Sequence, residues 1–311
     1  MNSIGIGFAL LGTSNTKFIT DKEAINIFNY IKDNGINRFD TAPLYGGGLS
    51  EERLGNLLKY IDREDYTLST KVGRYRPYSE KIKDPKNNSS DWYDYSSDTT
   101  ERSIFKSLER LNTEYLDIVF IHDCDNYIDE ALKYCLPVLY KLKKQGIIKK
   151  IGCGSNIAIT HENFLDKTEI DILMVAGRYT LLDQSANNSL FKKVIEKSVE
   201  VELASPFNSG VLASGAKDKN ARFDYLPVTK EIFEKVKRIE EICNYYNVSI
   251  KCVALNYSLS HPAVKRLILG LVDPAGLESN INDLNVKIPN ELWQDLSEIG
   301  IQMPIGGNKF V

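Results

Sequence analysis

The sequence lacks the cysteine patterns that mark disulfide-rich or zinc-binding proteins. Its five cysteines, Cys124, Cys135, Cys153, Cys243 and Cys252, are an odd number, and no two of them are spaced as Cys-x-x-Cys. This usage favours reduced thiols over a disulfide framework, and it gives no ligand set for zinc. We therefore predict that the chain has no metal site.

The chain also lacks an excess of charge of one sign and long apolar runs. It has 39 basic and 42 acidic residues, and no basic stripe interleaved with aromatic residues, which argues against a nucleic-acid partner. No apolar run approaches twenty residues, and the N-terminus has no basic segment followed by an apolar one. We expect a cytoplasmic protein without a membrane partner, and the sequence does not predict its oligomeric state.

Short apolar runs alternate with helical patterns along the whole chain. The runs, which are rich in β-branched residues, occupy residues 4–12, 36–40, 66–71, 116–122, 148–154, 170–177, 199–205 and 264–270. Thr20 and Glu23 form a capping box for the first helical pattern, and Gly35 stands where that helix would stop. No linker divides the 311 residues. This repeat favours a single (β/α)8 TIM barrel over a doubly wound sheet, with one domain over residues 1–311.

Four titratable residues fall at the ends of predicted strands, where barrel enzymes keep their chemistry. Asp40 ends the second strand, Lys71 the third and His122 the fourth, and Tyr45 lies in the loop after the second. Residues 72–98 are long for a connection and are expected to form a loop over the active site. Residues 303–311 are expected to form a short tail.

These four residues suit proton transfer to or from a carbonyl or alcohol. A tyrosine has a pKa near 10, and lowering it by three units requires roughly 4 kcal/mol, which an ammonium about 4 Å away can supply. We assign that role to Lys71, with Asp40 compensating the buried charge, and we expect neutral His122 to donate a hydrogen bond to the substrate oxygen. Singly, Asp40 could be a turn or helix cap, Tyr45 a packing group and Lys71 a solvated strand end. His122 is the stronger candidate, because it closes an apolar strand in which an unpartnered imidazole would be costly.

The glycine-rich segments do not match the dinucleotide-binding fingerprint. The segment GIGFALLG lacks the third glycine and the helix that should follow it. The glycines at 46–48 are expected to form a turn before Ser50 caps a helix. Residues 205–212 and 270–280 lie after the last two strands, where barrels often bind phosphate, although ordinary connections would look the same.

Several motifs resemble, in order and spacing, those of the aldo-keto reductases, and most of all the D-threo-aldose 1-dehydrogenase group. They are FDTAPLYGGGLSEERLG, LSTKVGR, SLERLNTEYLDIVFIHD, GIIKKIGCGSN, GRYTLLDQS, PFNSGVLAS and HPAV…LILG…LESN. The resemblance implies a (β/α)8 barrel that binds a nicotinamide dinucleotide without a Rossmann fold. It also implies that Asp40, Tyr45, Lys71 and His122 are the catalytic tetrad, with Tyr45 as the acid in reduction and the base in oxidation.

The same resemblance implies the cofactor-binding residues. Ser155 and Asn156 match the positions that hold the carboxamide; Ser205, Pro206, Phe207 and Gly210 match the loop at the pyrophosphate; Gly270 and Asn280 match the adenosine site. Two positions depart from the family. Ala176 stands where many members have a glutamine for the carboxamide, and Ala204 where many stack a tyrosine on the nicotinamide. Arg178 or local packing is a candidate for these roles.

Asp273 is the residue on which the choice of cofactor depends. Family members that use NADP place Lys or Arg between the positions matching Gly270 and Asn280, and this chain has none there. A carboxylate repels a phosphate dianion but accepts a hydrogen bond from a free ribose hydroxyl. We therefore predict NAD, with NADP less favoured.

The leading hypothesis for function is oxidation of an aldose, such as fucose, at C1 to its lactone. Trp92 and Asn208 are predicted to contact the substrate, and the wall candidates in the same loop are Arg74, Tyr78, Tyr93 and Tyr95. Two alternatives use the same residues: oxidation of pyridoxal and reduction of a small aldehyde. A further alternative is a non-catalytic sensor that binds the nicotinamide cofactor and reports its redox state.

Overall fold

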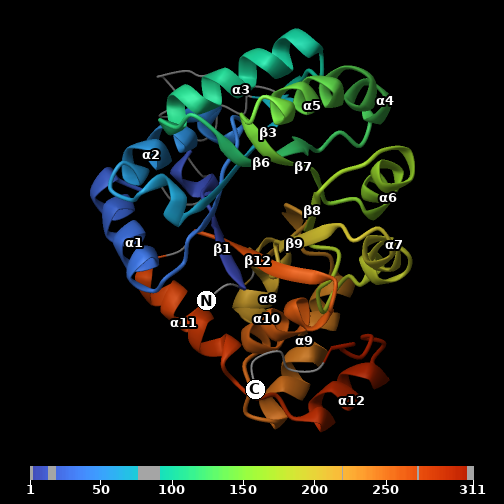
Figure 1. Cartoon of the computed structure of the whole chain (residues 1–311). Helices are drawn as coiled ribbons and strands as arrows, with labels where there is room; N and C mark the ends of the chain where they lie inside the picture. The colour runs from blue at the N-terminus through green and yellow to red at the C-terminus, as the bar shows by residue number, and fades with distance from the viewer. Residues whose placement is uncertain (1–2, 13–18, 76–91, 219, 272, 307–311) are drawn as a thin grey trace.

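The protein is a closed parallel barrel surrounded by helices (Figure 1). The computed structural model describes residues 3–12, 19–75, 92–218, 220–271 and 273–306. The order of hydrogen-bonded barrel strands is β1-β12-β9-β8-β7-β6-β3-β2, and β2 pairs with β1 to close the ring. The strands are β1 Ile4–Gly7, β2 Arg38–Asp40, β3 Thr67–Val72, β6 Leu116–His122, β7 Ile148–Ser155, β8 Ile172–Ala176, β9 Glu200–Ala204 and β12 Val264–Gly270. All eight predicted strands and the predicted barrel are therefore confirmed.

Helices connect the strands and cover the outside of the barrel (Figure 1). The α-helices are α1 Asp21–Asp33, α2 Leu49–Leu58, α3 Ser97–Leu111, α4 Ile128–Glu130, α5 Leu136–Lys144, α6 Ala158–Lys167, α7 Leu190–Glu196, α8 Val211–Ser214, α9 Lys230–Tyr245, α10 Ile250–Ser260, α11 Pro274–Leu284 and α12 Asn290–Glu298. The short turns are η1 Ala9–Leu11, η2 Tyr45–Gly48, η3 Arg63–Asp65, the π-helical η4 Ala131–Cys135, η5 Ser185–Asn187, η6 Asn208–Gly210 and η7 Gly215–Lys217. In the described part of the chain, no helix is long and apolar enough to cross a bilayer.

Two local predictions about helix starts have different outcomes. The capping box is confirmed, because Thr20 accepts a hydrogen bond from the backbone of Glu23 and Glu23 accepts one from the backbone of Thr20. The prediction that Ser50 caps a helix is wrong, since α2 begins at Leu49 with Gly48 before it. The buried hydroxyl of Ser50 donates instead to the carbonyl of Phe8 at 2.7 Å, which ties α2 to the end of β1.

The alternation of side chains along each strand separates the inside of the barrel from the outside. On β6, Val119 and Ile121 belong to the large core between strands and helices, whereas Ile118 and Phe120 belong to a smaller apolar cluster. His122 has the same parity as Ile118 and Phe120. The alternation therefore directs His122 into the barrel at the end of its strand.

A buried ion pair crosses the inside of the barrel. Arg38 of β2 donates through Nε and Nη2 to the two carboxylate oxygens of Glu202 of β9, at 2.8 and 2.5 Å. Arg266 of β12 donates to the same carboxylate at 2.9 Å. Arg38 and Glu202 are 1% and 0% exposed. The pair thus connects strands that are not neighbours in the sheet and fixes the shape of the barrel.

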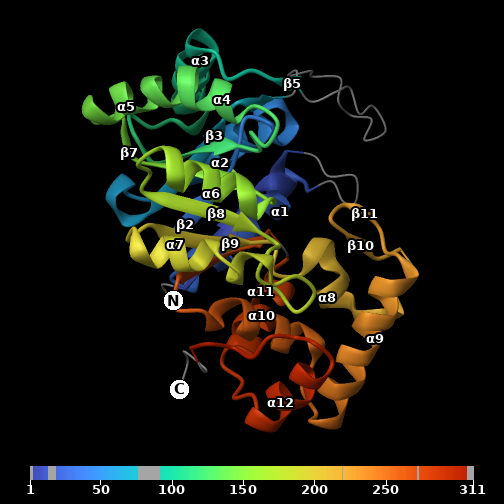
Figure 2. The same ribbon diagram turned by 90° about the vertical axis from the view of Figure 1, so that its right-hand side faces the viewer.

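Two small hairpins lie on one side of the barrel (Figure 2). The first pairs β4 Arg74–Tyr75 with β5 Trp92–Tyr93, and the second pairs β10 Arg222–Phe223 with β11 Leu226–Pro227. They follow barrel strands β3 and β9, so both belong to the end of the barrel where the strands terminate. Residues of both hairpins line the cleft described next.

Candidate active site

A cleft of about 560 Å³ opens at the carboxyl ends of the strands. Tyr45, Lys71 and His122 line it, together with Ser155, Asn156 and Ser205 from later strand ends. Residues that are far apart in the sequence thus meet in one cavity, at the end of the barrel where such enzymes place their chemistry.

Lys71 and Asp40 form a buried ion pair at the floor of the cleft. Lys71 Nζ donates to Asp40 Oδ2 at 2.6 Å and to the carbonyl of Thr41 at 2.8 Å. Ser69, two residues before Lys71 on the same strand, donates to the other carboxylate oxygen at 2.5 Å. Burial lowers the pKa of Lys71, but the Asp40 charge and the Tyr45 phenol outweigh it and raise the pKa above its ordinary value. Lys71 is therefore a permanent cation.

Backbone geometry brings Tyr45 to this ion pair. Gly46, Gly47 and Gly48 have φ of 67°, 66° and 102°, which side chains other than glycine disfavour. Gly12 of the preceding loop packs directly behind, because a Cβ there would lie 2.3 Å from the carbonyl carbon of Tyr45. The predicted turn at 46–48 is confirmed, and this close approach gives the physical reason for it.

The Tyr45 ring lies near both Lys71 and His122. Lys71 Nζ is 5.0 Å from the ring centre, and the His122 ring centre lies 6.1 Å away with the two planes nearly perpendicular. Burial raises the pKa of Tyr45 to about 12, Lys71 opposes this rise, and Asp40 adds to it. The prediction that Lys71 lowers the pKa of Tyr45 towards 7 is wrong in this structure. Burial raises this pKa by more than the Lys71 ammonium lowers it.

Ser155 is held in one orientation by its neighbours. Its hydroxyl donates to Asp125 Oδ1 at 2.5 Å and accepts the backbone N–H of Ile157 at 2.9 Å. With its proton engaged, the hydroxyl has one lone pair left, so it can accept an N–H from a ligand in the cleft. That chemistry fits the amide group of a nicotinamide.

The backbone around Ser155 and Asn156 is fixed from behind. His161 Nε2 lies 3.1 Å from the carbonyl of Ser155, and because burial lowers the pKa of His161 to about 4, the neutral ring donates this bond. Arg178 Nε donates to the carbonyl of Asn156, and the same guanidinium binds Asp183 at 2.8 Å. Arg178 therefore supports Asn156 and does not line the cleft.

Ala176 and Ala204 lie opposite each other on β8 and β9, and both line the cleft. Their small side chains leave room in the cleft. Tyr225, in the turn between β10 and β11, lines the same cleft. This turn is anchored at two points: Asp224 accepts from Arg178 Nη2 at 2.6 Å, and the backbone N–H of Tyr225 donates to Ser209 Oγ at 3.0 Å. The sequence analysis did not select Tyr225.

The loop after β9 contains several left-handed residues. Ser205, Asn208, Ser209 and Gly210 have φ of 55°, 45°, 59° and 103°, and the N–H groups of Asn208 and Gly210 donate to the carbonyls of Ser205 and Phe207 within the loop. Pro206 is buried and Phe207 packs against the core. Asn208 is 1% exposed and donates to the carbonyl of Gly177 at 3.2 Å, while no described residue donates a hydrogen bond to its Oδ1. Asn208 does not line the cleft, and its unpaired oxygen can only accept a hydrogen bond, so the predicted substrate contact of Asn208 stays a prediction.

The predicted adenosine residues lie outside the cleft, at the end of β12 and on α11. Gly270 ends β12, and Asn280 is buried in α11. Asp273 caps α11, accepting the backbone N–H of Gly276 through Oδ1 at 2.8 Å. Lys251 is a basic group next to this helix, but it pairs with Asp283 at 2.9 Å.

The predicted substrate wall is only partly at the cleft. Trp92 lines a neighbouring groove, whereas Tyr93 and Arg74 line the cleft itself. Tyr95 is buried and donates to the carbonyl of His122 at 2.7 Å, and Tyr78 is outside the described residues. The sequence analysis also missed Asp123, although a carboxylate directly after a strand-ending histidine was the available signal.

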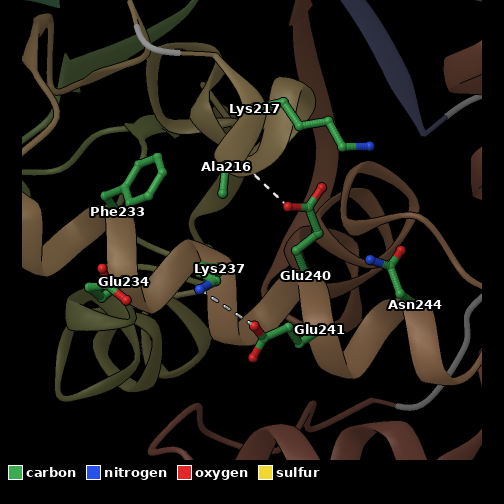
Figure 3. Close-up of a pocket in the computed structure, with 8 residues that line it drawn as sticks. All are labelled: Ala216, Lys217, Phe233, Glu234, Lys237, Glu240, Glu241 and Asn244. Atoms are coloured by element: carbon green, nitrogen blue, oxygen red, sulfur yellow. Dashed lines mark hydrogen bonds and ion pairs between the residues drawn. The ribbon is translucent and has the colours of Figure 1, made fainter.

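A second groove lies on the outer helices, between η7 and α9 (Figure 3). Three of its charged groups have partners: Glu240 accepts from the N–H of Ala216, and Lys237 lies 4.0 Å from Glu241. None of the predicted site residues lines it. The cleft at the strand ends is therefore the candidate active site.

Comparison with known proteins shows the family of the chain. The model of the aldo/keto reductase family matches residues 3–301. D-threo-aldose 1-dehydrogenase from a Pseudomonas species is 32% identical, over 95% of this chain and 93% of the relative. Pyridoxal 4-dehydrogenase from Microbacterium luteolum is 28% identical, over 97% and 94%.

Solved structures show the same fold. The holo form of an aldo-keto reductase from Bacillus halodurans superimposes with a TM-score of 0.77 at 22% identity, over 99% of this chain and 94% of the other. A glycerol dehydrogenase from Gluconobacter oxydans gives 0.73 at 20% identity, over 95% and 90%. The matched family model and the aldose dehydrogenase relative together show that this chain belongs to the aldo/keto reductase family, whose members are nicotinamide-dependent oxidoreductases.

Proposed function

We propose that the protein oxidises the anomeric carbon of an aldose to a lactone, with NAD as the electron acceptor. The observation that supports this most directly is the contact between the Lys71–Asp40 pair and the Tyr45 ring, 5.0 Å from the ammonium, in a cleft with His122. The similarity to D-threo-aldose 1-dehydrogenase supports the substrate class.

In this proposal Tyr45 exchanges the substrate's hydroxyl proton. In oxidation the phenolate takes the proton from the C1 hydroxyl, and in reduction the neutral phenol returns it. Lys71 stabilises the phenolate, and His122 orients the substrate oxygen by a hydrogen bond. Loss of this proton accompanies departure of a hydride, with both electrons, from C1, and a nicotinamide bound in the cleft would supply the acceptor for it.

The described residues provide a fitting site for that cofactor. Ser155 and Asn156 would hold the carboxamide, and the left-handed turn from Ser205 to Gly210 would face the phosphates. Gly270, Asp273 and Asn280 would lie at the adenosine end. Asp273 has one carboxylate oxygen bonded to the α11 backbone, which leaves the other for a ribose hydroxyl.

The preference for NAD is a separate part of the proposal. Lys251, next to α11, already pairs with Asp283 and donates to Ser279 at 2.5 Å, so it is not available to a 2′-phosphate without breaking these contacts. We expect kcat/KM to be at least tenfold higher with NAD than with NADP. A clear preference for NADP would contradict the role given to Asp273.

Turnover decides between this proposal and its alternatives. Purified protein with NAD is assayed on a panel of aldoses, pyridoxal and small alcohols, and in reverse with NADH on aldehydes, by absorbance of the reduced cofactor. We expect oxidation of at least one aldose, and its loss in Tyr45→Phe with cofactor affinity retained. Activity on pyridoxal or simple aldehydes alone would favour those alternatives, and tight cofactor binding without any turnover would favour the sensor.

A further inference from the structure

Asp123 has a backbone conformation that brings its side chain into the cleft. A residue following His122 in a continuing strand would face the outside of the barrel. Asp123 instead has φ of 47°, an unusual left-handed value for aspartate, and its N–H donates to the carbonyl of Gly154 at 2.8 Å. The strand therefore ends at this residue, and the carboxylate lines the cleft beside His122.

Arg74 meets Asp123 from the neighbouring strand end, because β4 follows β3 and β3 pairs with β6. It belongs to β4 and donates through Nη1 to Asp123 Oδ2, and its guanidinium lies 5.7 Å from the centre of the Tyr93 ring. Both charged side chains remain partly accessible, at 27% and 24%. The ion pair is thus a feature of the cleft wall that a ligand can reach.

The pair lies close to the reacting groups. Asp123 Oδ2 is 3.6 Å from Nε2 of His122, the residue proposed to bind the substrate oxygen. Burial raises the pKa of Asp123, and the charge of Arg74 opposes this rise, so the carboxylate has lost part of its water. Substrate hydroxyls can replace that water as donors to the carboxylate, and the guanidinium can donate to the same hydroxyl oxygens.

We propose that Asp123 and Arg74 bind a pair of neighbouring hydroxyl groups next to the reacting carbon and so select polyhydroxylated substrates. The inference rests on the proposed function, since it says which residues bind the other hydroxyl groups of the sugar that is oxidised. An ion pair with no net charge suits a neutral sugar. A substrate without these hydroxyls gains nothing from the pair.

The test compares two substrates that share the reacting group. L-Fucose and the other aldoses of the panel have the anomeric hydroxyl and neighbouring hydroxyls, whereas 2-hydroxytetrahydropyran has the anomeric hydroxyl alone. In Asp123→Asn we expect kcat/KM for the best aldose to fall about 10- to 100-fold, mainly through KM, as lost hydrogen bonds to a charged group predict. For 2-hydroxytetrahydropyran we expect a change below about threefold. Equal losses on both substrates, or no loss, would overturn the proposal.

A matched control lies on the same strand. Asp117 at the start of β6 also forms an ion pair with an arginine, Arg63, at 2.7 Å, but it is not part of the cleft. Asp117→Asn should leave the ratio of the two kcat/KM values unchanged. Arg74→Gln should lower that ratio in the same direction as Asp123→Asn.

Binding distinguishes this proposal from the proposed function. Calorimetric titration of the NAD-loaded protein with each aldose measures affinity independently of turnover. One outcome is that no aldose is oxidised, but one binds to the wild type and at least tenfold more weakly to Asp123→Asn. The proposed function is then wrong, and the hydroxyl site formed by Asp123 and Arg74 is supported. If aldoses are oxidised but Asp123→Asn binds them equally well, or if no aldose binds, the hydroxyl site is wrong.

Discussion

Replacing Lys71 by methionine tests the electrostatic control of Tyr45. With the 5.0 Å from Nζ to the ring centre taken as the charge separation, an effective dielectric of about 20 gives an interaction of about 3 kcal/mol. This energy corresponds to about two pKa units. Lys71→Met should therefore raise the pKa of Tyr45 further above its present value of about 12.

The assay is the rate of oxidation between pH 6 and 10. Because this range lies below the pKa of Tyr45, the phenolate fraction and the oxidation rate should rise about tenfold per pH unit, whereas reduction by the neutral phenol should be nearly flat. In Lys71→Met the oxidation profile should keep its slope and lie about two log units lower. An oxidation rate within threefold of the wild type, or a wild-type oxidation rate that falls with pH, would refute the reasoning.

Stability needs its own control in this experiment. Without Lys71, the buried Asp40 carboxylate keeps the Ser69 hydroxyl but loses its countercharge, which destabilises a fold by about 3–5 kcal/mol. The double variant Lys71→Met/Asp40→Asn removes the orphaned charge as well. We expect it to recover most of the lost Tm while its oxidation rate remains low.

Three further predictions concern the scaffold and the cofactor site. Glu202→Gln should lower the free energy of unfolding in urea by about 3–5 kcal/mol. Glu200→Gln breaks partly exposed ion pairs and should lower it by less than about 1 kcal/mol. Similar losses in the two variants would contradict the structural role of Glu202. Burial raises the pKa of Glu202, but its arginine partners outweigh burial and hold this pKa below its ordinary value. The ion pair therefore stabilises the fold at pH values above the pKa of Glu202 in the unfolded chain. This stabilisation is lost as the pH falls through the pKa of Glu202 in the folded protein. Asp125→Ala should weaken NAD binding about tenfold in calorimetry, because it removes the acceptor of the Ser155 hydroxyl, which is proposed to bind the nicotinamide amide; unchanged affinity would argue against that contact. Gly12→Ala should lower kcat at least tenfold, because its Cβ would displace the Tyr45 backbone; wild-type kcat would show that the close approach is not needed.

The barrel was predictable because its signal repeats. Each strand is a short apolar run, and eight of them in one chain without a linker leave few alternatives. The ends were less predictable. The first run was expected to extend over residues 4–12, but β1 stops at Gly7 and Ala9–Leu11 form a turn. Apolar residues fill a buried turn as readily as a buried strand, so composition alone does not locate the end.

The residues of the candidate site also differ in how predictable they are, depending on whether they lie at strand ends or in connections. Lys71 and His122 lie at strand ends, where the order of strands and the alternation of side chains give their positions. Asp123, Asp125 and Tyr225 lie in connections, where backbone conformation decides their direction. Asp123 and Tyr225 have φ of 47° and 66°, and the sequence does not predict such values for these residue types. Their role in the cleft is visible only once the loops are placed.

The two ion pairs inside the barrel differ in whether a charged group remains available to a ligand in the cleft. Both are almost fully buried, so burial does not separate them. Glu202 receives bonds on both oxygens from two arginines, Arg38 and Arg266, and the pair spans strands without reaching the cleft. Lys71 engages two of its three N–H groups with Asp40 and Thr41 among the described residues, which leaves one for the phenol of Tyr45 or a substrate oxygen. The remaining donor, at the open end of the barrel, supports the chemical role that we propose for the second pair.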